Sequence, residues 1–247
     1  MWGVIADPGP AAKSPSATKG RVVGPGHLGQ CAAKRGAQVD WRVEEYEGLP
    51  STQDVVKARA ATGEAEGLVV RALWQEAGYG RRGRTWASPL GNLYASALLR
   101  PPALAATRAG ELSLVAGAAL ALALPGARLK WPNDLLIGGR KCAGVLVETG
   151  LSGAVVAWAA LGMGVNADAP PPGAGAVPGA DLDAILEALA EVYALWQRAG
   201  LAPVRAAWLA RCAHAPGQRI TAAGHTGVFQ GLDADGALLL SGRRVTT

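Results

Sequence analysis

Cysteine and histidine are scarce in this sequence. Its 247 residues include three cysteines, Cys31, Cys142 and Cys212, which lie far apart and form no C-x-x-C pair. An odd number of dispersed cysteines argues against a disulfide framework or a zinc site and favours reduced thiols in a cytosol. The three histidines are equally dispersed, so the sequence predicts no metal site built from protein ligands.

Long hydrophobic runs are also missing. No stretch approaches the ~18 unbroken apolar residues of a membrane-spanning helix, and the N-terminus lacks the basic-then-apolar pattern of a signal peptide. We therefore expect a soluble, cytoplasmic protein with no membrane partner. The net charge of +5 tolerates an anionic partner such as a nucleotide. The basic residues are scattered apart from one cluster, so the charge does not require a nucleic-acid partner.

The chain changes character twice. Residues 1–40 combine proline, glycine, alanine and serine with little periodicity, which predicts a flexible N-terminal segment. Between residues 41 and 214 both periodicities occur. We expect helices from Ser51 and over 111–124, 181–199 and 203–213, and strands over 67–73, 92–99, 128–131, 135–137, 143–147 and 154–161. Residues 215–247 carry short alternating runs broken by glycines, typical of a small β-barrel. The predicted fold class is α+β, a mixed sheet with packed helices followed by a β module.

The densest chemical signal is G-Y-G-R-R-G-R-T-W over residues 78–86. Its glycine spacing alone is weak evidence, because Pro89 and Gly91 follow where a dinucleotide-binding turn needs a helix. The combination says more: glycines let backbone N–H groups approach an anion, and the interleaved guanidiniums match phosphate oxygens. Trp86 offers a flat face for a ring. A solvated basic loop or a nucleic-acid patch explains this stretch about equally well.

The second signal is K-W-P-N-D-L over residues 130–135. Pro132 disfavours helix at the residue before it, and Asn133 with Asp134 favours a turn. The run therefore places a lysine, an amide and a carboxylate on one tight connection. Taken alone, it fits an ordinary turn between strands better than a site.

The third signal is G-R-K-C-A-G-V-L-V-E over residues 139–148. Lys141 opens an apolar strand, where its ammonium can enter a pocket and meet a carboxylate and a phosphate together. A strand-edge lysine in solvent is the commoner alternative. Cys142 is better explained as a small apolar strand residue than as a reactive thiol.

Together, and in this order, the three signals resemble the active-site signature of biotin–protein ligases. That signature continues with G-x-G-x-N, found here at residues 162–166. Upstream, Ser51-Thr52-Gln53 resembles the family's S-T-N segment, and Gln75 matches the glutamine just before the loop. The resemblance covers residue 48 to the C-terminus.

This sequence departs from the family pattern at three positions. Tyr79 stands where the loop often carries another arginine, so one phosphate contact is missing or is supplied by Arg82. Gln53 replaces the usual asparagine, and Asp168 replaces a further one. The frequent N-terminal DNA-binding domain has no counterpart, which favours a ligase-only form that does not bind DNA.

The resemblance implies a fold and an activity. The fold is a class II synthetase-like catalytic domain over residues 41–214 and an SH3-like β-barrel over residues 215–247. The activity is that of an ATP-dependent ligase, which activates biotin as biotinyl-5′-AMP and transfers it to a lysine of a biotin carboxyl carrier protein. Mg²⁺ is expected with the phosphates. A homodimer is compatible with this picture.

The resemblance also assigns residues to roles. Lys141 and Arg81 are the expected catalytic residues. The expected biotin-binding residues are Ser51, Thr52, Gln53, Gln75, Gly78, Gly80, Arg81, Arg82, Gly83, Arg84, Trp86, Lys141 and Gly144. The expected nucleotide-binding residues are Arg81, Arg84, Trp86, Lys130, Asn133, Asp134, Lys141 and Asn166.

Three other functions stay open from the sequence. A lipoate– or octanoate–protein ligase or transferase resembles the same catalytic fold, although the loop and the K-W-P-N-D run favour biotin. A nucleic-acid-binding module using residues 78–84 leaves Lys141 and the Asn-Asp turn unexplained. A non-catalytic biotin sensor would bind biotin without making the adenylate.

Overall fold

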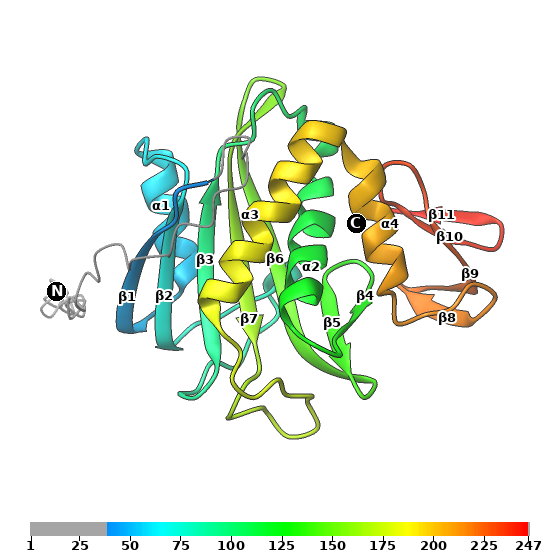
Figure 1. Ribbon diagram of the computed structural model, residues 1–247, viewed down its shortest axis with the longest axis horizontal. Coiled ribbons are helices and arrows are strands. Elements are labelled where there is room, and N and C mark those ends of the chain that lie inside the picture. Colours follow the sequence, from blue (N-terminus) through cyan, green and yellow to red (C-terminus); the bar gives the residue numbers. More distant parts are fainter. Residues whose placement is uncertain (1–38, 247) are drawn as a thin grey trace, which may run out of the picture.

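The computed structural model describes residues 39–246. The flexible segment predicted for residues 1–40 therefore lies outside the described residues, apart from its last two. Seven strands form the larger sheet, in the order β1-β2-β3-β7-β6-β5-β4 (Figure 1). These strands are β1 (Arg42–Leu49), β2 (Leu68–Gln75), β3 (Leu93–Leu99), β4 (Arg128–Lys130), β5 (Asp134–Ile137), β6 (Arg140–Ser152) and β7 (Val155–Val165). β1 and β2 pair in parallel and all other neighbours are antiparallel, which confirms the predicted mixed sheet.

Helices cover both faces of this sheet. The helices are α1 (Thr52–Ala61), α2 (Glu111–Ala123), α3 (Leu182–Ala199) and α4 (Leu201–Ala210), with the short 3-10 turns η1 (Arg81–Gly83) and η2 (Ala106–Arg108). α2 and α3 pack on one face with α4 beside them, and α1 lies on the other (Figure 1). Strand alternation separates the two faces. Ala97 and Leu99 of β3 join the core under α2 and α3, whereas Leu98 joins the smaller cluster under α1.

α3 shows why the predicted helix over 181–199 forms. Asp181 is its N-cap, and the carboxylate accepts hydrogen bonds from the backbone N–H groups of Asp183 and Ala184, each at 3.3 Å. Its apolar stripe, including Ile185 and Leu189, is buried. The helix stops at Gly200, whose φ of 70° leaves the helical region.

One apolar segment, Ala106–Ala123, has the length and composition that could cross a membrane. It comprises η2 and α2, and most of α2 is buried between the sheet and its neighbouring helices. A helix that is apolar on nearly all sides is explained by such a core position.

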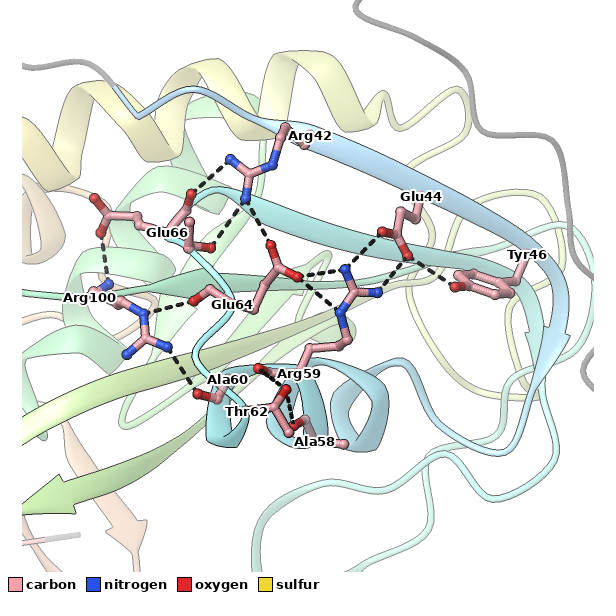
Figure 2. A network of polar contacts seen from close by, with 11 residues as sticks. Arg42, Glu44, Tyr46, Ala58, Arg59, Ala60, Thr62, Glu64, Glu66 and Arg100 are labelled. Carbon is pink, nitrogen blue, oxygen red and sulfur yellow. Dashed lines mark hydrogen bonds and ion pairs between the residues drawn. The ribbon is translucent and has the colours of Figure 1, made fainter.

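The edge strand β1 was not expected from the sequence, because acidic residues are depleted in strands. Ion pairs explain its formation (Figure 2). Arg59, near the end of α1, pairs with both Glu44 of β1 and Glu64, and Arg42 of β1 also reaches Glu64. The hydrogen bond from Arg59 holds the pKa of Glu64 below its usual value. Charged side chains also discourage another chain from pairing with this edge.

β6 and β7 are longer than the predicted strands over 143–147 and 154–161. They form a long antiparallel hairpin, paired from Ala143 opposite Val165 to Ser152 opposite Val155. Glycines inside both strands broke the apolar pattern on which the shorter predictions depended. The longest strands of the sheet therefore carry several positions without a side chain.

The C-terminal residues form a separate four-stranded antiparallel sheet, in the order β11-β10-β9-β8. Its strands are β8 (Arg219–Ala222), β9 (His225–Leu232), β10 (Leu238–Leu240) and β11 (Arg243–Val245). Phe229 and Leu238 join the same apolar core as α2 and α4. The Trp131 indole N–H also donates to the Gly236 carbonyl at 3.1 Å. These contacts hold the small sheet against the end of β4.

Candidate active site

A cavity of about 320 Å³ opens on the face of the large sheet that carries α1. Its walls come from the start of α1, from residues 78–86 (the arginine loop), from β6 and β7, from the β4–β5 connection and from the β8–β9 turn. Segments distant in sequence therefore converge here, including all three chemical signals of the sequence.

Glycines form the floor of the cavity. Gly162 and Gly164 of β7 and Gly144 of β6 line it, whereas Leu161 and Ala143 lie in the core under α2 and α3. A Cβ atom on Gly164 would lie 2.6 Å from the Trp86 ring. A Cβ atom on Gly162 would lie 2.8 Å from the side-chain oxygen of Gln53. Because these glycines have no side chain, the strands leave room for Trp86 and Gln53 to approach the backbone.

The arginine loop covers this floor. Its two limbs are joined by hydrogen bonds from the Trp86 N–H to the Gly78 carbonyl (2.8 Å) and from the Gly80 N–H to the Arg84 carbonyl (2.7 Å). The tip reverses direction through Arg82 and Gly83, with φ values of 59° and 68°. Such values suit glycine and are unfavourable for arginine.

Trp86 leaves the arginine loop and lies against the bare strands. Its ring would contact a Cβ atom on either Gly144 or Gly164. Its buried indole N–H has no hydrogen-bond partner within residues 39–246. A flat apolar surface with a spare donor suits a planar or ring-bearing ligand.

Positive charge dominates the cavity wall. Five lining residues are cationic, and Asp134 is the one acidic residue among the lining side chains in the described part of the chain. The cationic residues are Arg81, Arg82, Arg84, Lys130 and Lys141. Burial lowers the pKa of Arg81, and the neighbouring charges of Arg82 and Arg84 lower it further. An anionic ligand would relieve this repulsion.

Lys141 and Arg81 meet at the β4–β5 connection. The Lys141 ammonium pairs with the Asp134 carboxylate at 2.6 Å and lies 5.0 Å from the centre of the Trp86 ring. A long contact of 3.5 Å joins the Arg81 guanidinium to the Asn133 side-chain oxygen. The amide of Asn133 is oriented by its donation to the Val145 carbonyl at 2.6 Å. The Trp131–Pro132 peptide bond before this pair is cis.

The opposite end of the cavity holds neutral polar groups. Gln75 accepts hydrogen bonds from the backbone N–H (2.9 Å) and the hydroxyl (3.2 Å) of Thr52, whose hydroxyl also bonds to that of Ser96 at 2.9 Å. Ser51 occupies the N-cap position of α1, as predicted, but makes no side-chain capping bond. Gln53 donates to the Ala160 carbonyl at 3.1 Å, and its buried side-chain oxygen has no partner among the described residues. This end can exchange hydrogen bonds with an uncharged polar ring.

Most of the predicted site residues line the cavity, but three do not. Gly78 packs against the Ser88 hydroxyl, and Gly83 faces open space at the loop tip. Asn166 is buried and donates to the backbone carbonyls of Lys141 (3.2 Å) and Gly175 (3.3 Å). Its amide therefore supports the backbone of Lys141 from behind the cavity.

Several lining residues were missed by sequence reasoning. Ser96 is a buried hydroxyl in an otherwise apolar strand, and that isolated polar residue was an available signal. Gly162 and Gly164 were noticed only as parts of a motif. Ala222, at the end of β8, and Ala223, in the β8–β9 turn, carry no chemical signal and reach the cavity only through the fold.

The residues present are compatible with a magnesium ion that arrives with phosphates. Within residues 39–246 no cluster of three or more histidine, cysteine, aspartate or glutamate side chains could hold a metal alone. Asp134 and Asn133 line the cavity with side-chain oxygens of the type that would coordinate it. Mg²⁺ commonly takes one or two carboxylates and completes its shell with phosphates and water.

The sequence and the fold match those of a known family of ligases. The model of the biotin/lipoate A/B protein ligase family matches residues 46–166, and this chain belongs to that family. The chain is 45% identical over 204 residues to a biotin–[acetyl-CoA-carboxylase] ligase of Paracoccus denitrificans, covering 70% of this chain and 83% of that protein.

Two further relatives are a bifunctional ligase/repressor and a biotin protein ligase of known structure. The bifunctional ligase/repressor BirA of Escherichia coli is 47% identical over 102 residues, which is 38% of this chain and 31% of that protein. The structure of biotin protein ligase from Aquifex aeolicus in complex with biotin and ATP superposes with a TM-score of 0.66 at 25% identity. That match covers 80% of this chain and 90% of the Aquifex chain.

Proposed function

We propose that this protein is an ATP-dependent biotin–protein ligase, which makes biotinyl-5′-AMP and transfers the biotinyl group to a lysine of a biotin carboxyl carrier protein. One observation supports this most directly. Arg81 and Lys141, which are 60 residues apart in sequence, line one cavity and meet through the adjacent residues Asn133 and Asp134. Family membership, and relatives named for biotin rather than lipoate, support the choice of substrate.

The chemistry requires activation of a poor acylating agent. In the first step, a biotin carboxylate oxygen bonds to the α-phosphorus of ATP, and the α–β phosphate bond breaks to release diphosphate. In the second step, the ε-amine of the acceptor lysine attacks the activated carbonyl, AMP leaves with the bonding electrons, and the amine loses a proton. Neither step requires a covalent bond to the enzyme. Positioning and charge stabilisation can therefore supply the catalysis.

The cationic end of the cavity suits the first step. Negative charge moves onto the α-phosphate oxygens and the leaving diphosphate, and Lys141 and Arg81 are the cations best placed to stabilise it. We assign Arg84, Lys130, Asn133 and Asp134 to the nucleotide. A magnesium ion carried by the phosphates would supply further charge neutralisation there.

The neutral end of the cavity suits the ureido ring of biotin. That ring offers N–H donors and a carbonyl acceptor, matching the hydroxyls and amides of Ser51, Thr52, Gln53 and Gln75. We assign Trp86 to a position over the junction between biotin and adenylate. For Asn166 we propose an indirect role, because its amide holds the Lys141 backbone.

The proposal extends to organisation and partners. Residues 41–214 would form a class II synthetase-like catalytic domain, and residues 215–247 an SH3-like module that closes one side of the cavity. The acceptor would be a carrier domain of a carboxylase in the cytoplasm, with no DNA or membrane partner. Homodimerisation is compatible with this arrangement.

A radiolabelled diphosphate exchange assay tests the proposal. Enzyme, ATP, Mg²⁺ and biotin should exchange label into ATP, and an acyl-adenylate should be retained by the protein after gel filtration. Lipoate and octanoate, run in parallel, should support much slower exchange. Exchange with lipoate but not with biotin would show a lipoate–protein ligase instead. Binding of biotin without any exchange would indicate a non-catalytic biotin sensor.

A further inference from the structure

Lysine is rare in the part of the chain that the structure describes. Residues 39–246 contain three lysines, Lys57, Lys130 and Lys141, but sixteen arginines. Two of the three lysines, Lys130 and Lys141, line the cavity. A guanidinium does not lose its proton in proteins, so arginine offers no lone pair to an activated acyl group. Lys57 is therefore the one lysine of this range that lies outside the cavity wall and could react with such a group.

Lys57 lies close to the cavity all the same. It follows Gln53 by one turn of α1, and Gln53 lines the cavity. Its partner Glu148 follows the lining residue Leu146 by two residues on β6. Side chains four apart on a helix, or two apart on a strand, lie on the same face about 6 Å from one another. An acyl-adenylate that leaves the cavity would therefore pass near this amine.

Three oxygen-bearing side chains surround the Lys57 ammonium. It donates to the Glu148 carboxylate at 3.0 Å, to the Asp54 carboxylate at 3.3 Å and to the Tyr79 hydroxyl at 3.1 Å. Asp54 belongs to α1 itself and Glu148 to β6, so both ion pairs are made by regular elements of the fold.

These contacts favour the charged form of Lys57. Burial lowers the pKa of Lys57, but the hydrogen bonds to Tyr79 and Glu148 outweigh burial and hold that pKa above its usual value. A raised pKa means that even less free amine is present at neutral pH than in an ordinary lysine. The side chain remains 32% exposed, so a reactive molecule in solution can still reach it.

Protonation decides whether a lysine reacts with an acyl-adenylate. The nitrogen lone pair must attack the carbonyl carbon. The bond from that carbon to the phosphate oxygen then breaks, AMP leaves with the bonding electrons, and the nitrogen loses a proton to water. An ammonium has no lone pair, so the rate of acylation falls in proportion to the fraction of free amine.

We propose that Asp54 and Glu148 keep Lys57 in its ammonium form, and that this pairing prevents the enzyme from attaching biotin to itself at the lysine beside its own cavity. The acyl donor in this inference rests on the proposed function, whereas the low reactivity of Lys57 does not. Two separate experiments can therefore test the reactivity and its consequence.

An amine-reactive ester measures the reactivity of Lys57 without the enzyme's own chemistry. The ligand-free full-length protein would be treated briefly with the sulfo-N-hydroxysuccinimide ester of biotin, and mass spectrometry would follow the modification of Lys57. Glu148→Gln should react there on the order of fivefold faster, because a lost carboxylate raises the fraction of free amine. The double variant with Asp54→Asn should react faster still.

Two further variants serve as reference and control. Arg198→Lys places an exposed lysine on α3, where the arginine makes no ion pair within residues 39–246, and this lysine should react faster than Lys57 of the same protein. Glu44→Gln is the matched control, because Glu44 also pairs with a basic residue of α1, Arg59 at 3.3 Å, but does so from β1 (Figure 2). Its reaction at Lys57 should equal that of the unmodified protein. Unchanged reaction of Glu148→Gln, or equal acceleration by Glu44→Gln, would overturn the proposal.

Self-labelling during turnover tests the consequence. Enzyme, ATP, Mg²⁺ and biotin would be incubated without an acceptor, and biotin at Lys57 would be normalised to the diphosphate exchange rate of each variant. Glu148→Gln should carry on the order of fivefold more biotin at Lys57 than the unmodified enzyme, and adding Lys57→Arg should remove the excess. Equal labelling of the two enzymes with exchange intact would overturn the protective role. If no enzyme exchanges label, the proposed ligase function fails, while the ester experiment still decides whether the carboxylates suppress Lys57.

Discussion

The two faces of the β6–β7 hairpin differ sharply in the side chains that they carry. On the face under α2 and α3, Leu161, Ala143 and Val165 are fully buried in a continuous core. On the opposite face, the same strands present Gly144, Gly162 and Gly164 to the cavity. Successive residues of one strand thus serve stability and binding in turn, because side chains alternate across a sheet. Substitutions on the two faces should therefore have separable effects.

The largest effect should come from removing the ammonium on the cavity side. Lys141→Ala should lower biotin-dependent diphosphate exchange on the order of 10²-fold or more, because the developing phosphate charge loses a preorganised cation. The neighbouring variant Cys142→Ala is the control, since Cys142 is buried in the core. Its exchange rate should stay within about twofold, with a modest loss of stability. Near-normal exchange by Lys141→Ala would remove the basis of the proposed mechanism.

A second pair should separate the two faces directly. Leu161→Ala should lower the free energy of unfolding by about 2–5 kcal/mol, measured by denaturant titration, and leave KM for biotin nearly unchanged. Gly164→Ala should do the reverse. Its methyl group would meet the Trp86 ring, so KM should rise about tenfold while stability changes by under about 1 kcal/mol. If both variants changed the free energy of unfolding but not KM, the row of Gly144, Gly162 and Gly164 (the glycine row) would not be a binding surface.

The smallest effect should come from the hydrogen bond that holds the C-terminal sheet at the cavity. Trp131→Phe removes the donor to the Gly236 carbonyl and should cost about 1 kcal/mol more than Trp208→Phe. Trp208 is equally an indole in the core, but its N–H has no partner among the described residues. Denaturant titration of both variants isolates the hydrogen bond from the loss of ring volume. Equal losses would mean that this bond contributes nothing to the attachment.

The residues that line the cavity were more predictable from the sequence than the strands that carry them. Lys141, Arg81 and Asp134 could be found because charged and amide groups within a short apolar context signal chemistry by residue type. β1 could not, because its acidic residues become compatible with a strand through arginines on other elements, Arg59 for Glu44 and Arg71 for Glu45. Local propensity does not contain such tertiary pairing.

The remaining errors have related causes. The lengths of β6 and β7 were underestimated, because glycines that serve the cavity interrupt the pattern that indicates a strand. Ala223 could not be found at all, since an alanine in a turn becomes a wall residue only when the two sheets meet. Tyr79 was noticed as a departure from a motif, but its partners Asp54 and Glu148 lie 25 residues before it and 69 after it.

The glycine row also has a consequence for the life of the protein in a cell. Each glycine within a strand lowers the stability of the folded state by roughly 0.5–1 kcal/mol relative to alanine. The longest strands are therefore weakest beside the cavity. A ligand that binds against the glycine row only in the folded state would stabilise that state. The gain is about 2.7 kcal/mol when the ligand concentration is a hundred times its dissociation constant. The supply of biotin and ATP would then affect how fast the protein is degraded, because ligand-free molecules unfold more often and are cut by proteases first.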